Sequence, residues 1–217
     1  VRFLTGNGNY TDDINMRGQA YVFFLRSDVA HGTLKSVGTS EAAAMDGVIQ
    51  IFTGDDFAEI GGMPCGWQVT DKHGEAMQEP KHPVLAHGKV RHVGEPIAAV
   101  VAETLEQARD AAEAIEVEID ELPAVINMKD AVQERAPKVH DVLTSNLCYD
   151  WGFVEENKDA VNKAFEDAAH VTTLELVNNR LVANPMEPRV AIGDFNRSDG
   201  EHTLYTTSQN PHVIRLL

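Results

Sequence analysis

The strongest constraint on the fold is a run of seven apolar residues in mid-chain, Pro96–Ala102. A run of this length after a turn-forming glycine is typical of a strand buried on both faces. Directly after it, Thr104 is placed to cap a helix and Gln107 to complete a capping box. The apolar residues of that helix fall on one face, which predicts packing against the sheet. They are Leu105, Ala108, Ala111, Ala112 and Ile115.

Neighbouring patterns extend this unit into an α/β domain. Glu116–Asp120 alternates acidic and apolar residues, which predicts a strand with one exposed face. Upstream, Thr39-Ser40 can cap a short helix over Glu41–Met45, and Val48–Phe52 is typical of a strand. Leu122-Pro-Ala-Val125 closes the unit, so the domain is expected to end near residue 125.

The chain opens with a glycine- and asparagine-rich segment, Arg2–Asp13, which predicts an irregular loop. Its glycines at 6 and 8 invite a phosphate-binding interpretation. That motif requires a preceding strand and a following helix, and neither is predicted here. Ala20–Arg26 then predicts a strand, and its lack of polar alternation predicts burial on both faces.

Charge and cysteine content narrow the possible partners. The 217 residues include 34 acidic and 18 basic ones, for a formal net charge of −16. Nucleic acids and anionic membrane surfaces require a basic patch, so both are excluded as partners. The sequence has no apolar run long enough to insert into a membrane. Two widely spaced cysteines, Cys65 and Cys148, form neither a disulfide framework nor a metal motif, which indicates a reducing cytoplasm.

Residues 61–92 are rich in glycine, proline and histidine and are expected to form a loop. The histidines His73, His82, His87 and His92 invite a metal-site hypothesis. They lack the i, i+4 spacing and the Cys/His clusters of a metal site built by the protein, so no metal ligand is predicted. Cys65 has no base nearby in the sequence and is interpreted as structural.

Residues 127–150 contain prolines and mixed charges without a clear period, which predicts a linker. Ala160–Ala169 then predicts an amphipathic helix, with Val161, Ala164, Phe165 and Ala168 on one stripe that is interpreted as core. Val171–Val177 predicts a strand that leads into the final segment.

The final segment contains a β-hairpin. Two apolar runs, Arg189–Phe195 and His202–Ser208, flank the polar turn Asn196–Gly200, whose Asp-Gly ending tolerates the positive φ of a tight turn. Glu187 lies between two prolines, where neither a helix nor a central strand can continue. Glu187 and Gln209 are therefore expected at the two ends of the hairpin, where functional side chains are often placed.

Several of these segments, in this order, carry a resemblance to a known family. They are Phe-Leu-Thr-Gly-x-Gly-x-Tyr-x-Asp-Asp at 3–13, Gly-Glu-Pro-Ile-Ala-Ala-Val-Val-Ala at 94–102, Leu-Pro-Ala-Val at 122–125, Pro-Met-Glu-Pro-Arg at 185–189 and Thr-Ser-Gln-Asn-Pro-His at 207–212. Together they resemble the large subunit of the molybdenum hydroxylases, which include aerobic carbon monoxide dehydrogenase, xanthine dehydrogenase and aldehyde oxidase. Pro-Met-Glu-Pro-Arg is most similar to the carbon monoxide dehydrogenase-like branch.

The resemblance implies a mixed α/β (α+β) architecture in three parts. Residues 1–126 would form an α/β-hammerhead domain, residues 127–150 a linker, and residues 151–217 the beginning of a molybdopterin-binding domain. Such enzymes hydroxylate a carbon centre with oxygen from water, using molybdenum bound to molybdopterin or its cytosine dinucleotide. Electrons leave through [2Fe–2S] clusters to FAD on a small and a medium partner subunit, in a dimer of heterotrimers, and the carbon monoxide branch also uses copper.

By position in the family motif, Gln209 would hydrogen-bond an oxygen ligand of the molybdenum. The residues alone leave open the alternative that Gln209 satisfies nearby backbone. Glu187 and Arg189 are interpreted as a structural ion pair that fixes the hairpin.

The glycine-rich cofactor loop, the active-site loop and the general-base glutamate of the family do not occur in these 217 residues. Both ends of the chain look cut. We therefore expect an N-terminal part of a large subunit, without a catalytic residue of its own and without tightly bound pterin when isolated. The alternative is a freestanding, non-catalytic α/β module used for binding or assembly.

Overall fold

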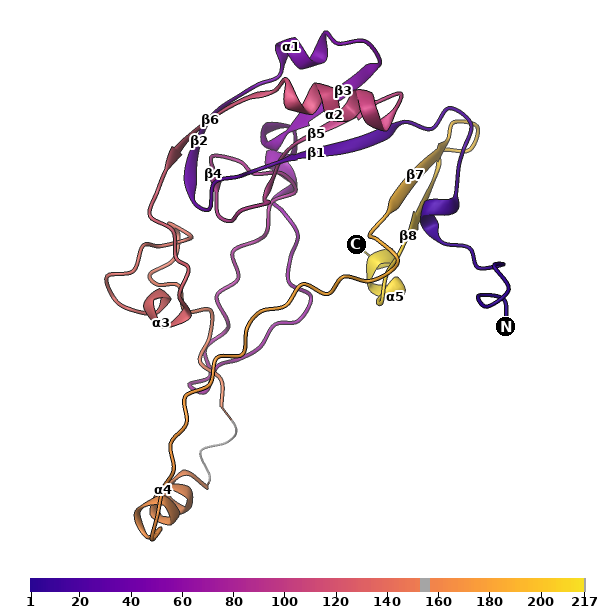
Figure 1. Cartoon of the computed structure of the whole chain (residues 1–217). Coiled ribbons are helices and arrows are strands. Elements are labelled where there is room, and N and C mark those ends of the chain that lie inside the picture. Colours follow the sequence, from indigo (N-terminus) through magenta and orange to yellow (C-terminus); the bar gives the residue numbers. More distant parts are fainter. Residues whose placement is uncertain (153–156, 217) are drawn as a thin grey trace. The chain divides into compact units, whose positions relative to one another are not determined.

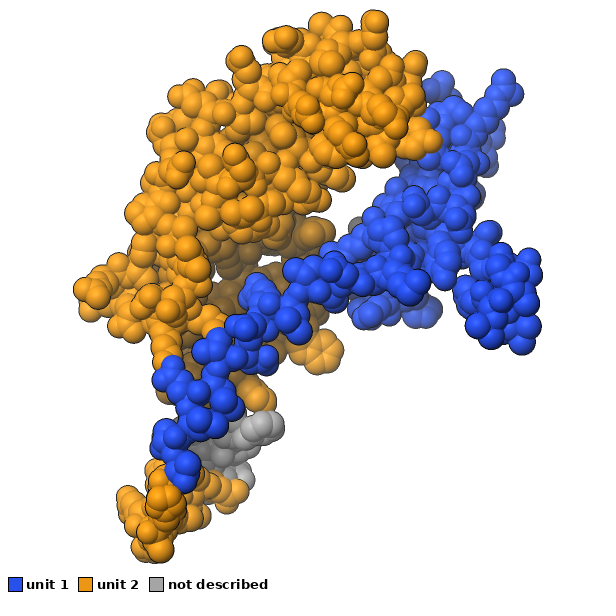
Figure 2. Space-filling model, viewed as in Figure 1, with its two compact units in different colours: residues 1–19, 172–217 blue, residues 20–171 orange. Residues whose placement is uncertain are grey.

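The structure, a computed structural model, describes residues 1–152 and 157–216 (Figure 1). The chain divides into two compact units, which are coloured separately in Figure 2. The larger unit comprises residues 20–171, and the smaller one combines residues 1–19 with residues 172–217. The architecture is mixed α/β, as the sequence predicts.

The larger unit is built around a three-stranded antiparallel sheet of order β1-β5-β3. The central strand β5 (Pro96–Ala102) pairs with β1 (Tyr21–Arg26) on one side and with β3 (Val48–Thr53) on the other. This central position explains the apolar run, because Ile97, Ala98, Val100 and Ala102 are all at most 2% exposed. The prediction of a buried strand over these residues is confirmed.

One face of this sheet is covered by α2 (Leu105–Glu113), beside the short α1 (Ser40–Ala43) (Figure 1). Ala108, Ala111 and Ala112 are buried against β5, because small side chains let the helix approach the sheet closely. The predicted cap is present, since Thr104 Oγ1 accepts a hydrogen bond of 3.2 Å from the Gln107 amide. The capping box is only half formed, because the Gln107 side chain lies beside Gly47 instead of returning to the cap.

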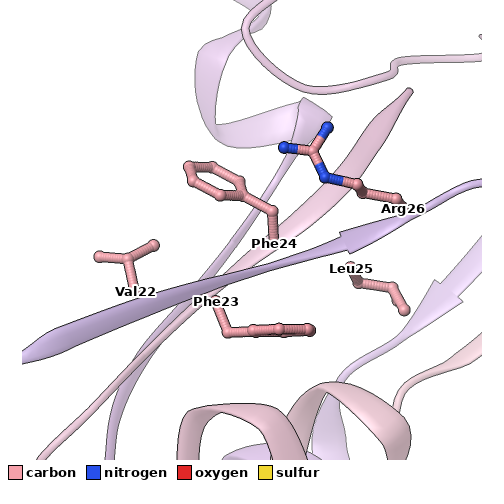
Figure 3. A pocket seen from close by; sticks show the side chains of 5 residues that line it. All are labelled: Val22, Phe23, Phe24, Leu25 and Arg26. Carbon is pink, nitrogen blue, oxygen red and sulfur yellow. The ribbon is translucent and has the colours of Figure 1, made fainter. Parts of the chain in front are cut away.

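The opposite face of β1 is open. Phe23 and Leu25 pack into the core on the side of α2, whereas Val22 and Phe24 point to the other side of the strand and are 47% and 42% exposed (Figure 3). The Arg26 guanidinium lies 5.7 Å from the centre of the Phe24 ring and covers part of it. The prediction that β1 is buried on both faces was therefore wrong, because the helices cover the sheet from one side.

A second three-stranded sheet has the order β4-β2-β6, formed by β4 (Lys89–Val90), β2 (Gly32–Gly38) and β6 (Glu116–Glu121). In β6 the acidic residues are exposed while Val117 and Ile119 are half-buried against Val90 and Ile97, which confirms the predicted alternation. Strands β2 and β4 were not predicted. The first begins and ends in glycine and contains a lysine, and the second has only two residues, so pairing within the sheet defines both.

The loop and linker regions are held by specific hydrogen bonds. A 3₁₀ helix, η2 (Gly54–Ile60), leads into the predicted loop, which carries isolated bridges between Met63 and His82 and between Thr70 and Ala76. The predicted linker region contains one short helix, α3 (Met128–Ala131). After it, the Asn146 side-chain amide donates to the carbonyls of Ala131 (3.0 Å) and Pro137 (2.9 Å).

One ion pair anchors this linker region to the second sheet. Lys89 Nζ lies 2.6 Å from Asp141 Oδ2, and its side chain is only 15% exposed. The hydrogen bond from Lys89 lowers the pKa of the Asp141 carboxyl. Burial, reinforced by the nearby Arg91 guanidinium, lowers the pKa of His140, so the docked segment favours a neutral imidazole at this position.

Two predictions for residues 158–177 were wrong. The helix is present as α4 (Lys158–Glu166), but its apolar stripe is not core, since Val161 is 49% and Phe165 63% exposed. Val171–Val177 is irregular and forms no strand in the described structure. Leu174 and Leu176 in this segment are 75% and 80% exposed.

The smaller unit contains the 3₁₀ helix η1 (Thr11–Asp13), the hairpin β7 (Ala191–Asn196) and β8 (Glu201–Thr206), and α5 (Pro211–Leu216). The opening residues form turns, as predicted for Arg2–Asp13. Across the described ranges of both units, no helix combines the length and apolar character needed to cross a membrane.

The covered face of the first sheet should respond to truncation more strongly than the open face. Val100→Ala should destabilise the 217-residue chain by about 2 kcal/mol, because two methyl groups are lost from a site with no exposure. Val22→Ala removes the same groups from the neighbouring strand at a half-exposed position and should cost less than about 1 kcal/mol. Urea unfolding followed by circular dichroism measures both. Equal losses would show that both faces are buried in solution.

Candidate functional site

The hairpin of the smaller unit is formed as predicted. Strands β7 and β8 pair without a register shift from Ala191 opposite Thr206 to Asn196 opposite Glu201. The turn is fixed by its own polar groups, because Asn196 Oδ1 accepts from the Ser198 amide (3.0 Å) and hydroxyl (2.7 Å). Gly200 has a φ of +77°, which explains why the turn ends in glycine.

The two motifs that flank the hairpin meet at its open end. Thr206 Oγ1 donates to the carbonyl of Val190 at 3.2 Å. One residue further, Thr207 Oγ1 donates to Glu187 Oε1 at 3.0 Å. The proline-flanked acid and the Thr-Ser-Gln-Asn segment therefore lie side by side, although 20 residues separate the two hydrogen-bonded side chains in the sequence.

Gln209 occupies the turn between β8 and α5. The turn is tightened by Ser208 Oγ, which accepts a hydrogen bond of 2.9 Å from the Asn210 amide. Gln209 itself is exposed, and its side chain forms no hydrogen bond with any residue that the structure describes. The alternative in which Gln209 satisfies nearby backbone thus has no hydrogen bond to support it, and the amide keeps both N–H donors and its oxygen available.

The predicted ion pair between Glu187 and Arg189 was wrong. Within residues 157–216 these two side chains form no salt bridge, and the Glu187 carboxylate instead takes its hydrogen bond across the base of the hairpin. Arg189 is exposed, and an ion pair at such a position contributes little in water. Sequence reasoning missed the contact with Thr207, although the hairpin register that brings Thr207 to the base was predictable.

The four histidines considered as metal ligands, His73, His82, His87 and His92, do not gather into one cluster. His87 Nε2 lies 3.1 Å from Asp55 Oδ1, and the rings of His82 and His92 are 6.0 Å apart, while His73 is exposed in its loop. The described residues contain no group of three or more His, Cys, Asp or Glu side chains that could hold a metal ion. Cys65 is exposed, and its thiol donates a hydrogen bond of 3.3 Å to the nearby Trp67 carbonyl.

Two protein-family models match the chain, one in its N-terminal part and one in its C-terminal part. Residues 5–123, more than half of the chain, match the α/β-hammerhead domain of aldehyde oxidase and xanthine dehydrogenase. Residues 139–217 match the molybdopterin cofactor-binding domain. The chain belongs to the molybdenum hydroxylase family. This membership confirms the resemblance seen in the sequence, and the cofactor-binding match includes Glu187, Thr207 and Gln209.

Individual molybdenum hydroxylases are similar along almost the whole chain. The carbon monoxide dehydrogenase large chain of Hydrogenophaga pseudoflava is 32% identical over 99% of this chain and 27% of its own length. The nicotine 6-hydroxylase large subunit of Paenarthrobacter nicotinovorans is 31% identical over 100% of this chain and 26% of its own length. The crystal structure of quinoline 2-oxidoreductase from Pseudomonas putida 86 superposes with a TM-score of 0.85 at 31% identity, covering 99% of this chain and 26% of that one. The chain thus spans about a quarter of the length of these relatives.

The turn at the tip of the hairpin should tolerate substitution poorly. Gly200→Ala places a β-carbon on a backbone with φ of +77°, which should destabilise the hairpin by about 1 kcal/mol. Gly193→Ala, in the middle of β7 with open space around it, is the matched control and should cost nothing or stabilise slightly. Hydrogen exchange of the 191–206 amides measures the difference. Equal protection in the two variants would contradict the assigned turn.

Proposed function

We propose that this chain is part of the molybdenum-binding large subunit of a hydroxylase or dehydrogenase, and that Gln209 contacts the cofactor. The observation that carries the proposal is the position of Gln209, which lies in the cofactor-binding match with its amide unpaired in the described structure. The proposed domains are residues 1–126, a linker at 127–150 and the start of the cofactor domain at 151–217, and the two family matches support this division. They weigh against the freestanding binding module, since together they reach most of the chain.

The groups at the base of the hairpin fit an oxygen-bearing metal centre. When bound, molybdenum with molybdopterin supplies the oxidation of a carbon centre with oxygen from water. Gln209 can donate its amide N–H to an oxygen ligand of that centre, and a neutral dipole held in a fixed direction tunes such a site without adding charge. Pro211 follows within two residues and restricts the backbone of Asn210, the residue next to Gln209.

The other cofactors and the partner subunits would be bound by parts of the enzyme outside these residues. We assign the cytosine dinucleotide form of the cofactor, [2Fe–2S] clusters on a small subunit and FAD on a medium subunit, in a dimer of heterotrimers, with copper if the enzyme belongs to the carbon monoxide branch. The terms "large chain" and "large subunit" in the names of the relatives support a multi-subunit enzyme. Those names also point to a small-molecule substrate, since they specify carbon monoxide and nicotine.

A reducing cytoplasm is the proposed location. Cys65 and Cys148 are both exposed and unpaired, which suits a compartment that keeps thiols reduced.

Gln209→Ala in the full-length enzyme should lower turnover by about 10- to 100-fold, the range observed when a side chain that supports a metal ligand is removed. The hammerhead domain should still fold, because Gln209 lies outside residues 5–123. Gln50→Ala, at an exposed glutamine of β3, is the control and should leave turnover unchanged. Steady-state kinetics with molybdenum and pterin analysis of each variant provides the test. Wild-type turnover in Gln209→Ala would refute the assignment of this residue.

The isolated 217-residue chain should not retain the cofactor through purification. It contributes one proposed contact, and a single hydrogen bond is too weak to hold a dissociable ligand. Pterin fluorescence after denaturation, calibrated against protein concentration, should therefore be far below stoichiometric. A stoichiometric signal would mean that these residues already form the principal cofactor site.

A further inference from the structure

The hydrogen bond between Thr207 and Glu187 has a consequence for Gln209. Its acceptor is a carboxylate oxygen, Glu187 Oε1, and its length is 3.0 Å. We propose that Glu187 is a positioning residue that holds Gln209 in its working orientation through Thr207. The inference rests on the proposed contact between Gln209 and the cofactor.

The backbone around Glu187 has little freedom. Pro185 and Pro188 each fix their own φ, and Pro188 also restricts Glu187 to extended conformations. Glu187 is half-buried, whereas residues 181–186 before it are exposed. Because the backbone of this segment is already restricted, little backbone entropy is lost when Glu187 forms its hydrogen bond to Thr207.

The segment that carries Gln209 is anchored on both sides. Before it, Thr206 bonds the Val190 carbonyl and Thr207 bonds Glu187. After it, the Asn210 amide bonds Ser208 Oγ, and α5 begins at Pro211. Of these anchors, only the one from Thr207 reaches a charged side chain, and hydrogen bonds to ionised acceptors are roughly twice as strong as neutral ones.

Removal of the Glu187 carboxylate should therefore release the Thr207 side chain and allow the backbone of Gln209 to move. A displacement of about an ångström is enough to reduce catalysis substantially when the displaced group must meet a reacting centre. The Glu187 side chain need not touch the cofactor to have this effect. A variant that retains an acceptor oxygen at position 187, or a hydroxyl at position 207, should keep most of the catalytic rate.

The experiment uses the complete enzyme with all its subunits and cofactors. Glu187→Ala and Thr207→Val remove the bond, whereas Glu187→Gln and Thr207→Ser keep it. Glu201→Ala removes an exposed carboxylate at the other end of the hairpin and serves as the control. The readouts are kcat and KM, hydrogen exchange over residues 205–212, and the electron paramagnetic resonance spectrum of the molybdenum.

Both bond-removing variants should lower kcat by about 10-fold with KM little changed, because positioning acts on the reacting state. Exchange over residues 205–212 should increase and the molybdenum spectrum should shift, while the Gln and Ser variants keep most of the wild-type rate and exchange protection. The double variant Glu187→Ala with Thr207→Val should be no worse than either single one, since both remove the same bond.

Two results would overturn the inference while the proposed function stands. One is a clear defect in Gln209→Ala together with wild-type kinetics, exchange and spectrum in Glu187→Ala and Thr207→Val. The other is an equal defect in Glu187→Ala and Glu187→Gln, which would show that the charge acts and not the hydrogen bond. If Glu187→Ala does not assemble, Thr207→Val and Glu187→Gln decide the same question. Wild-type turnover in Gln209→Ala would refute the proposed contact and this inference together.

Discussion

The burial of β5 is the constraint on which the larger unit depends. Its apolar residues form both the centre of the first sheet and the surface against which α2 packs. The turn before it is tied into the same structure, because the Ser27 amide donates to the Glu95 carbonyl (2.9 Å) and the Gly94 amide to the Ser27 carbonyl (2.7 Å). The Glu95 side chain is only 2% exposed and accepts a hydrogen bond from the Arg91 amide, which offsets part of the cost of burying a carboxylate. The ends of β1 and β5 are thereby joined next to the core.

The smaller unit has a different physical basis. Its hairpin contains no buried residue, and an isolated two-stranded hairpin is marginally stable in water. Polar contacts at the two ends therefore matter more here than apolar packing. The Asn196 side chain fixes the tip, and the side chains of Thr206 and Thr207 fix the base. The base is also where the proposed function places the cofactor contact, so the bonds that hold the hairpin together also set the position of Gln209.

Segments of the chain differ in how closely their local sequence predicts their structure. In the larger unit, Thr104 caps α2 and the acidic residues of β6 alternate with half-buried ones, in agreement with the pattern. In residues 158–177 the same kind of reasoning predicted core and strand, and the structure shows exposed side chains and no strand. An apolar stripe specifies only that a surface favours burial. It does not specify which part of the chain or of another molecule covers that surface.

The sequence by itself determined the strand, the helix and the hairpin whose signals are local, and its ordered motifs identified the family that the comparisons confirm. It did not determine that one face of β1 is open, since the run Val22–Leu25 is apolar throughout and only the placement of α2 distinguishes its two sides. Nor did it predict β2, which depends on pairing with β4 and β6. The partner of Glu187 was likewise decided by tertiary structure. Arg189 is closer in the sequence, but the hairpin register brings Thr207 to the carboxylate, and hydrogen bonds depend on distance in space.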